Sequence, residues 1–580
     1  MIRAENLSYG FAAKDLYNKI SFTLEDGRHC ALIGSNGTGK TTLVDLIRQP
    51  DQVLFDGKLF LESVGRIGYV SQFASREKHM DTPLFAYLSE DFLELQQRIA
   101  NVCLQMESAE DLDALLEEYQ QLLDESESMD ADNYEVNIHR QLKLAELEDK
   151  ADLELSKLSG GEYKLVQVIR QMLRRPGLLI MDEPDVFLDF ENLNGLRDLI
   201  NSYEGTLLVV THNRYLLEHC FDQIWHLENG DLQEFDGNFR EYNFFRLKKK
   251  IELQEASALG AAEIQRATEM VERLRKEATE VVDPGKGRSL KAKVTYLERW
   301  EARQIKPPFV EIRQPDIHLP HVDPSEEPEV LLKVEDYNLS FEEKLLDQVS
   351  FSVQTHDKVA IVGPNGTGKT TLLRAIWNRS HPSIQFSSEA NVGFFSQLQE
   401  ETLNENNSIY QEFYALGFDT SAQVEEYLKG YCFDPDTLGR KIRTLSGGEK
   451  NLLQLAKLSA GNANLLLLDE PSSHLDTFAQ MALEDAINAY QGAVLMVSHD
   501  FYSIANCADR ILYVENGTIR PMSSRAFRKM IYKNHFKLDY LELETRRKEL
   551  ETRISRLLES GEIAEAKALC EELGRIVESL

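Results

Sequence analysis

A phosphate-binding sequence pattern occurs twice in this chain of 580 residues. The pattern Gly-x-x-x-x-Gly-Lys-Thr covers residues 34–41 and returns at residues 363–370, each time after a short apolar run of strand character. Its glycines let backbone N–H groups curl around phosphate oxygens, the lysine neutralises the β- and γ-phosphates, and the threonine hydroxyl binds Mg²⁺. Two nucleotide sites are therefore expected, and the loop residues that would bind ATP are Gly34, Asn36, Gly37, Gly39, Lys40, Thr41, Thr42, Gly363, Asn365, Gly366, Gly368, Lys369, Thr370 and Thr371.

The duplication extends well beyond the two loops. The first loop is followed by Gln72, a Leu-Ser-Gly-Gly-Glu segment, an apolar run ending in Asp-Glu-Pro, and a Thr-His pair. After the second loop these blocks return in the same order, and from the Leu-Ser-Gly-Gly-Glu segment onward they stand 287 residues further along the chain. Gln72 and Gln397 are 325 residues apart, so the first copy carries 38 extra residues between its glutamine and that segment. The repeat unit is therefore a whole domain, far longer than a solenoid repeat.

Composition limits the class of protein. Hydrophobic residues make up 42% of the chain, which is enough for full cores, but no apolar run approaches the ~18 residues that span a bilayer. The N-terminus lacks the apolar stretch of a signal peptide, and the six cysteines are scattered without Cys-x-x-Cys spacing. We therefore expect a cytoplasmic protein with reduced thiols and no fused membrane domain.

The repeated blocks resemble the ATP-binding cassette (ABC) superfamily, whose signature motif is the Leu-Ser-Gly-Gly sequence. The resemblance covers both copies and most of the chain. It implies an α/β fold with two P-loop ABC ATPase cassettes that face each other head to tail. Each nucleotide would then lie between the phosphate loop of one half and the signature residues of the other, which are Ser159, Gly160, Gly161, Ser446, Gly447 and Gly448.

The same resemblance implies an ATPase and assigns roles at both sites. Glu183 and Glu470 are expected to orient and polarise the attacking water, and His212 and His499 to contact the γ-phosphate. Magnesium is expected to bind through Thr41, Gln72, Asp182, Thr370, Gln397 and Asp469. Phosphoryl transfer depends mainly on such positioning and charge neutralisation. Tyr9 and Phe341, at matching positions, are expected to stack on adenine, with an ordinary core aromatic as the alternative.

About 90 residues between the cassettes form the second informative region. Two helical patterns, separated by a Pro- and Gly-containing break at residues 283–287, predict an antiparallel helical hairpin. Residues 285–306 contain seven basic and two acidic side chains, in a chain whose net charge is −33. A solvated charged spacer is the plain alternative. We favour a rod with a basic tip that contacts RNA through Lys286, Arg288, Lys291, Lys293, Arg299 and Arg303.

Two cassettes in one chain, no membrane segment and an interdomain helical hairpin together resemble the ABC-F family. This resemblance implies a ribosome-binding monomer whose two cassettes dimerise within the chain, with the linker near the P-site tRNA and the peptidyl-transferase centre of the 23S rRNA. A general translation factor and ribosome protection against antibiotics both remain open. Two further alternatives are a transport ATPase that pairs with a separate membrane subunit, which has no use for a basic hairpin, and a DNA-acting ABC ATPase, which would carry coiled coils or zinc modules inside a cassette.

The expected domains follow from these boundaries. They are cassette 1 over residues 1–239 with a helical arm insertion near 85–147, the helical hairpin linker over 240–329, cassette 2 over 330–530, and a short C-terminal helical hairpin within 531–580.

The two copies differ directly after the catalytic glutamates. Cassette 2 continues Pro-Ser-Ser-His-Leu-Asp, close to the usual sequence of the family, whereas cassette 1 continues Pro-Asp-Val-Phe-Leu-Asp. Asp185 adds a carboxylate and Phe187 adds bulk at this segment. We therefore expect the two sites to hydrolyse ATP at different rates.

Overall fold

The chain forms two compact units in the computed structural model, which describes residues 1–11, 14–61, 65–72, 80–107, 112–186, 188–255, 314–322, 328–340, 344–535 and 538–579. The first unit comprises Met1–Asn238 and Arg313–Lys529 and contains both cassettes. The second unit includes residues 239–255 and the C-terminal helices.

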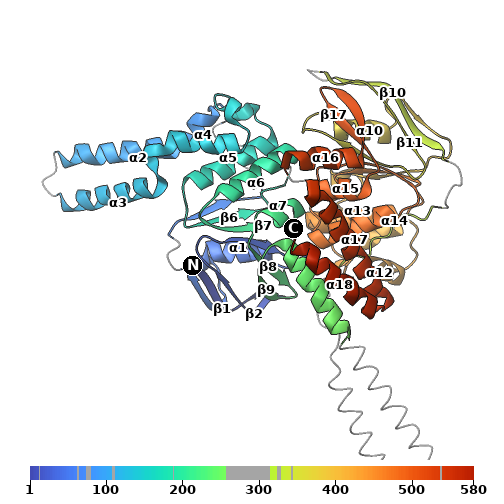
Figure 1. The fold of residues 1–580 in the computed structure, drawn as a ribbon, viewed down its shortest axis with the longest axis horizontal. Coiled ribbons are helices and arrows are strands. Elements are labelled where there is room, and N and C mark those ends of the chain that lie inside the picture. The colour runs from blue at the N-terminus through green and yellow to red at the C-terminus, as the bar shows by residue number, and fades with distance from the viewer. Residues whose placement is uncertain are drawn as a thin grey trace, which may run out of the picture. The chain divides into compact units, whose positions relative to one another are not determined.

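The first cassette is built on two sheets (Figure 1). Its three-stranded antiparallel sheet has the order β2 (Lys14–Leu24), β1 (Ile2–Phe11) and β4 (Asp56–Leu61). Its six-stranded sheet has the order β5 (Ile67–Val70), β6 (Leu178–Asp182), β7 (Thr206–Val210), β3 (His29–Ile33), β8 (Gln223–Glu228) and β9 (Asp231–Asp236). The helices are α1 (Lys40–Arg48), α2 (Leu84–Met106), α3 (Asp113–Met129), α4 (Tyr134–Leu144), α5 (Gly160–Leu173), α6 (Phe190–Ser202) and α7 (Arg214–His219).

The second cassette repeats this topology. Its three-stranded sheet has the order β11 (Lys344–Gln354), β10 (Val330–Ser340) and β13 (Ile384–Phe386). Its six-stranded sheet has the order β14 (Val392–Phe395), β15 (Leu465–Asp469), β16 (Ala493–Val497), β12 (Lys358–Val362), β17 (Arg510–Glu515) and β18 (Thr518–Ser523). The helices are α10 (Lys369–Trp377), α11 (Ile409–Tyr414), α12 (Ser421–Lys429), α13 (Gly447–Ser459), α14 (Thr477–Ala489), α15 (Phe501–Cys507) and α16 (Ser524–His535).

The central strands place the functional residues. Every residue of β6, β7, β15 and β16 is buried, as expected for parallel strands covered on both faces, and their sequences are accordingly almost continuous apolar runs. The strands β3, β6 and β7 run parallel to one another, so their carboxyl ends meet at one edge of the sheet. Ligands of open parallel sheets bind at this edge.

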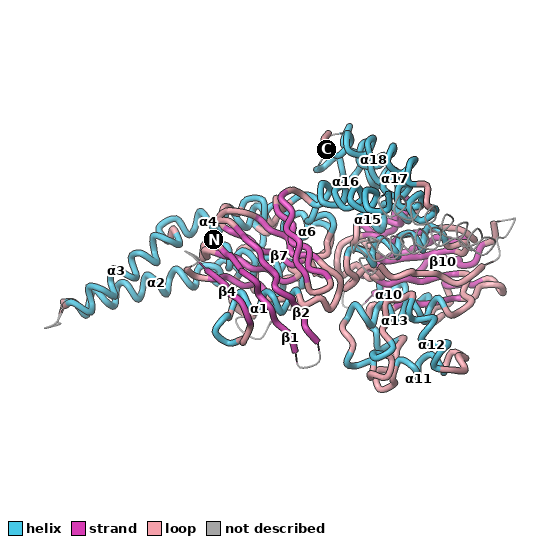
Figure 2. Tube along the Cα trace, turned by 90° about the horizontal axis from the view of Figure 1, so that it is seen from below, coloured by secondary structure: helices cyan, strands magenta, loops and turns pink. Residues whose placement is uncertain are grey.

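Helices α2 and α3 lie side by side as an antiparallel pair within the first cassette (Figures 1 and 2). This is the region in which the first copy carries its 38 extra residues. Asp91 on α2 is bound by Arg170 of α5, at 3.0 Å, and by Arg174, the residue that caps the C-terminus of α5. Although burial alone would raise it, these hydrogen bonds lower the pKa of Asp91 to about 2. The base of the arm is therefore fixed to the signature helix by a charged cluster.

The second unit is a helical cluster. It contains the helical residues 239–255, α17 (Leu538–Ser560) and α18 (Ile563–Val577), and α17 and α18 lie side by side in Figure 2. Its core contains Ile251, Leu550, Ile554 and Leu573, all nearly inaccessible to solvent. The start of the expected linker thus packs on the C-terminal hairpin. Residues 314–322, which the sequence assigns to the end of the linker, belong instead to the first unit, where the Asp316 N–H donates to Gly430 O at 2.7 Å.

None of the described helices is both long enough and apolar enough to cross a membrane.

Candidate nucleotide sites and their interface

Each phosphate loop joins a buried strand to a helix. In cassette 1 the loop connects β3 to α1, and Gly37 and Gly39 have φ angles of 79° and 100°. In cassette 2 it connects β12 to α10, and Gly366 and Gly368 have φ angles of 79° and 89°. These are left-handed conformations that glycine adopts without strain. Both loops are therefore folded alike, with the N-terminus of a helix directly behind them.

The lysine of each loop lies at its centre. Lys40 Nζ donates to Gly34 O at 2.8 Å and Ser35 O at 3.0 Å, and Lys369 Nζ makes the equivalent bonds to Gly363 O and Pro364 O. Burial lowers the pKa of both ammonium groups. A buried cation surrounded by backbone dipoles is a suitable partner for phosphate oxygens.

An aspartate ends β6 and another ends β15, each next to the threonine of its own loop. Thr370 Oγ1 donates to Asp469 Oδ1 at 2.9 Å, and Thr41 bonds to Asp182 in the same way. Burial raises the pKa of both aspartates, and these hydrogen bonds oppose the shift. A hydroxyl beside a carboxylate is a suitable ligand pair for Mg²⁺.

The two glutamates that follow have a strained backbone. Glu183 has a φ of 46° and Glu470 a φ of 49°, in the left-handed region that non-glycine residues avoid. Each backbone N–H donates to the neighbouring strand, Glu183 to Val210 O at 2.8 Å and Glu470 to Val497 O at 2.9 Å. Strain that recurs at both sites is typical of functional positions.

Both glutamates have strongly raised pKa values. Burial, together with the nearby charges of Asp185 and Asp182, raises the pKa of Glu183 to about 7. Burial raises the pKa of Glu470 to about 8, although the His499 N–H donates to its carboxylate at 3.2 Å. Carboxylates that titrate near neutral pH are suited to general base catalysis.

His212 and His499 line one cavity together with the two glutamates, and both imidazole rings are neutral. Burial lowers the pKa of His212 well below its usual value and that of His499 to about 4. His212 is 8% exposed, and neither ring nitrogen has a hydrogen-bond partner among the described residues. Asp469 Oδ2 and Glu470 Oε1 are likewise buried, and neither atom has a hydrogen-bond partner among the described residues. Buried polar atoms without partners are costly, so these groups fit a ligand that carries phosphate oxygens and a cation.

The two cassettes meet at the phosphate loops. The Asn36 N–H donates to Asp476 Oδ2 at 3.2 Å, and its side-chain amide donates to His474 O at 2.8 Å. In the opposite direction, the Asn365 N–H donates to Asp189 Oδ2 at 3.1 Å. Each loop thus contacts the segment that follows the strained glutamate, Glu183 or Glu470, of the other cassette.

The signature helices begin with matching caps. Ser159 and Ser446 each form a capping box with the glutamate three residues later, which starts α5 and α13. Gly448 packs so closely on the opposite loop that a Cβ atom there would lie 2.1 Å from Asn36 Nδ2. The signature of cassette 2 therefore lies against the phosphate loop of cassette 1, which is a head-to-tail arrangement.

A cavity of about 500 Å³ lies between the cassettes. Residues expected at both sites line it, namely Glu183, His212, Asn365, Gly366, Gly368, Lys369, Thr370, Thr371, Gln397, Glu470 and His499. A cavity of this size is within the usual range for small-molecule sites.

Comparison with known proteins identifies this arrangement. The family model described as ABC transporter matches residues 17–186 and 346–473, just over half of the chain. The chain belongs to the ABC transporter family. It has the ATP-binding cassette twice and is an ATPase.

Similar proteins show to which branch of the ABC family the chain belongs. ABC transporter F family member 2 of Arabidopsis thaliana is 28% identical over 529 residues, which cover 89% of this chain and 76% of that protein. The energy-dependent translational throttle protein EttA of Escherichia coli is 28% identical over 520 residues, covering 87% and 90% of the two chains. The similarity to tandem-cassette relatives over nearly the whole chain makes this an ABC-F protein.

A solved structure shares the fold. One chain in a model of ribosome-bound archaeal Pelota and ABCE1 has a TM-score of 0.53 at 20% identity, covering 92% of this chain and 80% of that one. The expected α/β class with two ABC cassettes is therefore confirmed.

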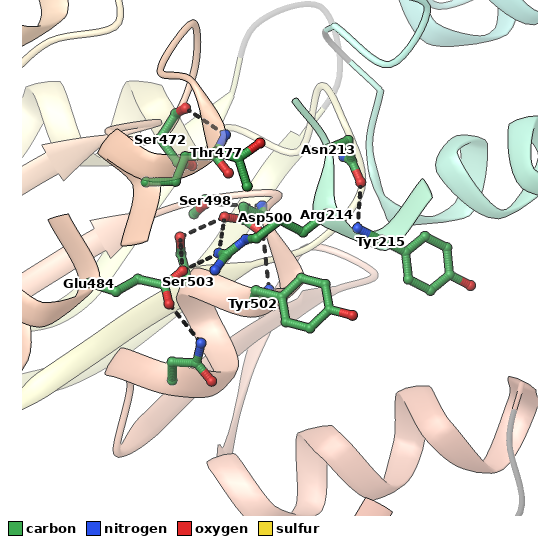
Figure 3. A network of polar contacts seen from close by, with 12 residues as sticks. Asn213, Arg214, Tyr215, Ser472, Thr477, Glu484, Ser498, Asp500, Tyr502 and Ser503 are labelled. Atoms are coloured by element: carbon green, nitrogen blue, oxygen red, sulfur yellow. Dashed lines mark hydrogen bonds and ion pairs between the residues drawn. The ribbon is translucent and has the colours of Figure 1, made fainter. Parts of the chain in front are cut away.

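The interface of this ABC-F protein is not symmetric. Arg214 of cassette 1 lies among cassette 2 residues, paired with Glu484 and 3.3 Å from Asp500 Oδ2 (Figure 3). Its guanidinium also lies 4.9 Å from the centre of the Tyr502 ring. The residue 287 positions later is Phe501, which contacts Phe190 instead, with ring centroids 6.1 Å apart. One side of the interface is therefore ionic and the other aromatic.

The remaining residues expected from the sequence are the two adenine-stacking aromatics and the basic residues of the linker. Tyr9 on β1 is half-buried, with its ring 6.2 Å from that of Tyr17. Tyr17 was not expected from the sequence, yet its hydroxyl donates to Gly39 O at 2.5 Å. The other expected residues, which are Phe341 and the six basic linker residues Lys286, Arg288, Lys291, Lys293, Arg299 and Arg303, lie outside the described residues.

Proposed function

We propose that Glu183 and Glu470 are the general bases of two ATP sites formed jointly by both cassettes. Their raised pKa values and recurrent backbone strain support this role. His212 and His499, with neutral rings, would donate a hydrogen bond to the γ-phosphate from one ring nitrogen. The signature residues of the opposite cassette would complete each site.

Magnesium would be held at the carboxyl ends of β6 and β15. The ligands would come from Thr41, Asp182 and Gln72 in the first site, and from Thr370, Asp469 and Gln397 in the second. The bound ion would supply charge neutralisation on the phosphate oxygens.

Glutamine substitution at each glutamate tests these roles. We expect Glu183→Gln and Glu470→Gln each to slow hydrolysis at its own site by about 100-fold or more while ATP binding is retained, because only the base is lost. Single-turnover hydrolysis and equilibrium binding of ATP measure the two quantities. Unchanged hydrolysis in the double variant would remove both residues from the mechanism.

Ribosome binding is the function that these sites serve in our proposal. The similarity of 87% of the chain to a translational throttle protein supports it most directly, and the structural neighbour in a ribosome-bound assembly agrees with it. ATP would bring the cassettes together, and hydrolysis would separate them. This is a population shift driven by the tighter binding of ATP to the closed state.

The basic linker would contact RNA near the P-site tRNA and the peptidyl-transferase centre. Its local excess of positive charge, in a chain of net charge −33, supports this placement. Neutralising Lys286, Arg288 and Lys291 with glutamine should weaken ribosome co-sedimentation and flatten its salt dependence, since each phosphate contact adds to the slope. Neutralising Lys248, Lys249 and Lys250, a charge-matched control outside the basic segment, should leave both unchanged. Equal effects of the two triple variants would argue against a linker contact.

One assay distinguishes the two proposed roles on the ribosome, that of a translation factor and that of a protection protein. A translation factor would alter the elongation of stalled ribosomes in the absence of drug. A protection protein would raise the resistance of the host cell to antibiotics that bind the peptidyl-transferase centre. Drug susceptibility with and without the gene separates these roles.

A further inference from the structure

Lys164 is a buried lysine on the signature helix α5, only 4% exposed to solvent. Lysine is rarely buried, because removing an unpaired ammonium from water is costly. Burial lowers the pKa of Lys164 to about 8, opposed by the negative charges of Asp185, Asp182 and Glu183. A neutral side chain at this position would avoid the cost of burying a charge. The contacts of the ammonium group therefore indicate what the lysine does.

Lys164 holds the glutamine loop of its own cassette. Its Nζ donates to Ser71 O and, at 2.9 Å, to Gln72 O. The side chain of Gln72 in turn donates from Nε2 to Glu183 Oε2 at 2.5 Å. Two consecutive contacts, Lys164 to Gln72 and Gln72 to Glu183, thus join the signature helix to the glutamate that we propose as the base.

Asp185 is the second charged residue that distinguishes the first site. It lines the same cavity as Glu183, and burial raises the pKa of its carboxyl group. Its Oδ1 accepts a hydrogen bond from Thr211 Oγ1 at 2.6 Å, which fixes the carboxylate beside the site.

Cassette 2 has neither charge. The residues 287 positions later are Asn451 and Ser472, both uncharged. Asn451 Oδ1 accepts a hydrogen bond from Gln399 Nε2 at 2.6 Å, two residues beyond Gln397, and its Nδ2 donates to Ser473 O at 2.5 Å. The loop is held there by Gln454, which exchanges hydrogen bonds of 3.2 Å with the backbone N–H and carbonyl of Ser396. The lysine and the aspartate therefore occur together in one site and are both replaced in the other.

We propose that Lys164 is a positioning residue of the first ATP site, which keeps Gln72 against Glu183. Together with Asp185, it also makes the first site chemically different from the second. Because Lys164 lies on the helix whose N-terminus presents the signature to the second site, it connects the glutamine loop of one site to the signature of the other. This inference rests on the proposed roles of Gln72 and Glu183.

Replacement of Lys164 with its cassette 2 counterpart, asparagine, tests the inference. In a Glu470→Gln background, where hydrolysis reports on the first site, Lys164→Asn should lower the turnover rate about tenfold or more, as expected for loss of hydrogen bonds from a charged group, with little change in KM for ATP. A turnover rate of Lys164→Asn equal to that of the Glu470→Gln background would overturn the positioning role.

A second readout needs no nucleotide. Lys164→Asn should increase hydrogen exchange in the peptide covering residues 65–72, because the loop loses its attachment to α5. Lys358→Met is the matched control: this lysine is also buried, and it donates to Tyr490 O at 2.8 Å and to Gly492 O. It should change overall stability without changing exchange in residues 65–72 or turnover at the first site.

The outcomes separate the two proposals. If Glu183→Gln abolishes turnover at the first site but Lys164→Asn changes neither turnover nor exchange, the positioning role is wrong and the proposed base remains. If Glu183→Gln leaves turnover intact, Glu183 is not the base, and the proposed function of the site is wrong whatever the effect of Lys164→Asn.

Discussion

Replacing Arg214 with methionine should weaken the contact between the cassettes. Methionine retains most of the apolar bulk of the side chain but removes its charge. Arg214 is 8% exposed and is the cation shared by Glu484 and Asp500. After the substitution, the carboxylates of Glu484 and Asp500 lie at a buried interface without the positive charge of Arg214.

The size of the effect follows from the geometry. At the 3.3 Å that separates Arg214 from Asp500, a charge pair contributes about 5 kcal/mol at an effective dielectric constant of about 20, before desolvation is subtracted. Breaking a buried ion pair by removing one partner costs about 3–5 kcal/mol. Glu484 keeps a hydrogen bond from Asn506 and Asp500 keeps one from Ser503, so we expect the lower end, about 3 kcal/mol.

Native-state hydrogen exchange measures this directly. The opening free energies of α7 and α14 should both fall by about 3 kcal/mol in the nucleotide-free variant, because Arg214 lies on α7 and its partner Glu484 lies on α14. Adding Glu484→Gln should restore part of the loss, since the amide still accepts a hydrogen bond and carries no charge.

An exposed ion pair provides the control. Arg3 and Glu5 are paired at 2.6 Å with side chains 53% and 39% exposed, so Arg3→Met should cost under about 1 kcal/mol. Equal losses in the Arg214 and Arg3 variants would refute the argument that burial makes the interface pair strong.

Three further predictions concern pH, the signature contact and the helical cluster. The pKa values of Glu183 and Glu470 are raised to about 7 and about 8 from 4.5, so the stability of the nucleotide-free protein should fall as pH rises from about 5 to about 8, and less so in the double glutamine variant, as denaturant titrations at each pH would reveal. Gly448→Ala should reduce ATPase activity by at least about tenfold, because a Cβ there meets the opposite phosphate loop, whereas Gly439→Ala, with open space around it, should not. Ile554→Ala should destabilise the second unit by about 2–5 kcal/mol, detected as faster hydrogen exchange in residues 239–255 with unchanged ATP binding.

The sequence predicted the residues that local rules determine. Strand, glycine-rich loop and helix follow one another within about a dozen residues, so the positions of Lys40 and Lys369 could be derived from spacing alone. The apolar runs before Asp182 and Asp469 likewise predicted buried strands that end in polar residues. The duplication then supplied a second, independent example of each motif.

Contacts between distant segments were not predictable in the same way. Arg214 meets Glu484 across 270 positions, and nothing in the sequence around either residue indicates the other. Lys164 looks like an ordinary surface lysine of an amphipathic helix until the fold places Ser71 and Gln72 against it. Comparison of the two copies singled out Asp185 but not Lys164, although both are replaced by uncharged residues in the second copy.

The helical cluster of the second unit shows a related limit. The sequence predicted a C-terminal helical hairpin within residues 531–580, and its two helices are α17 and α18. The sequence could not indicate that Ile251, at the start of the expected linker, completes their core, because a helical pattern specifies a buried face but not its partner.

Co-sedimentation of the Glu183→Gln, Glu470→Gln double variant with ribosomes, with and without ATP, tests the central claim most directly. We expect stable binding in ATP and little binding without it, since ATP would hold the cassettes together and the missing bases would prevent release. The same variant carrying Lys40→Ala and Lys369→Ala should not bind in either condition. Ribosome binding that is absent in ATP, or identical with and without it, would contradict a nucleotide-gated ribosome factor.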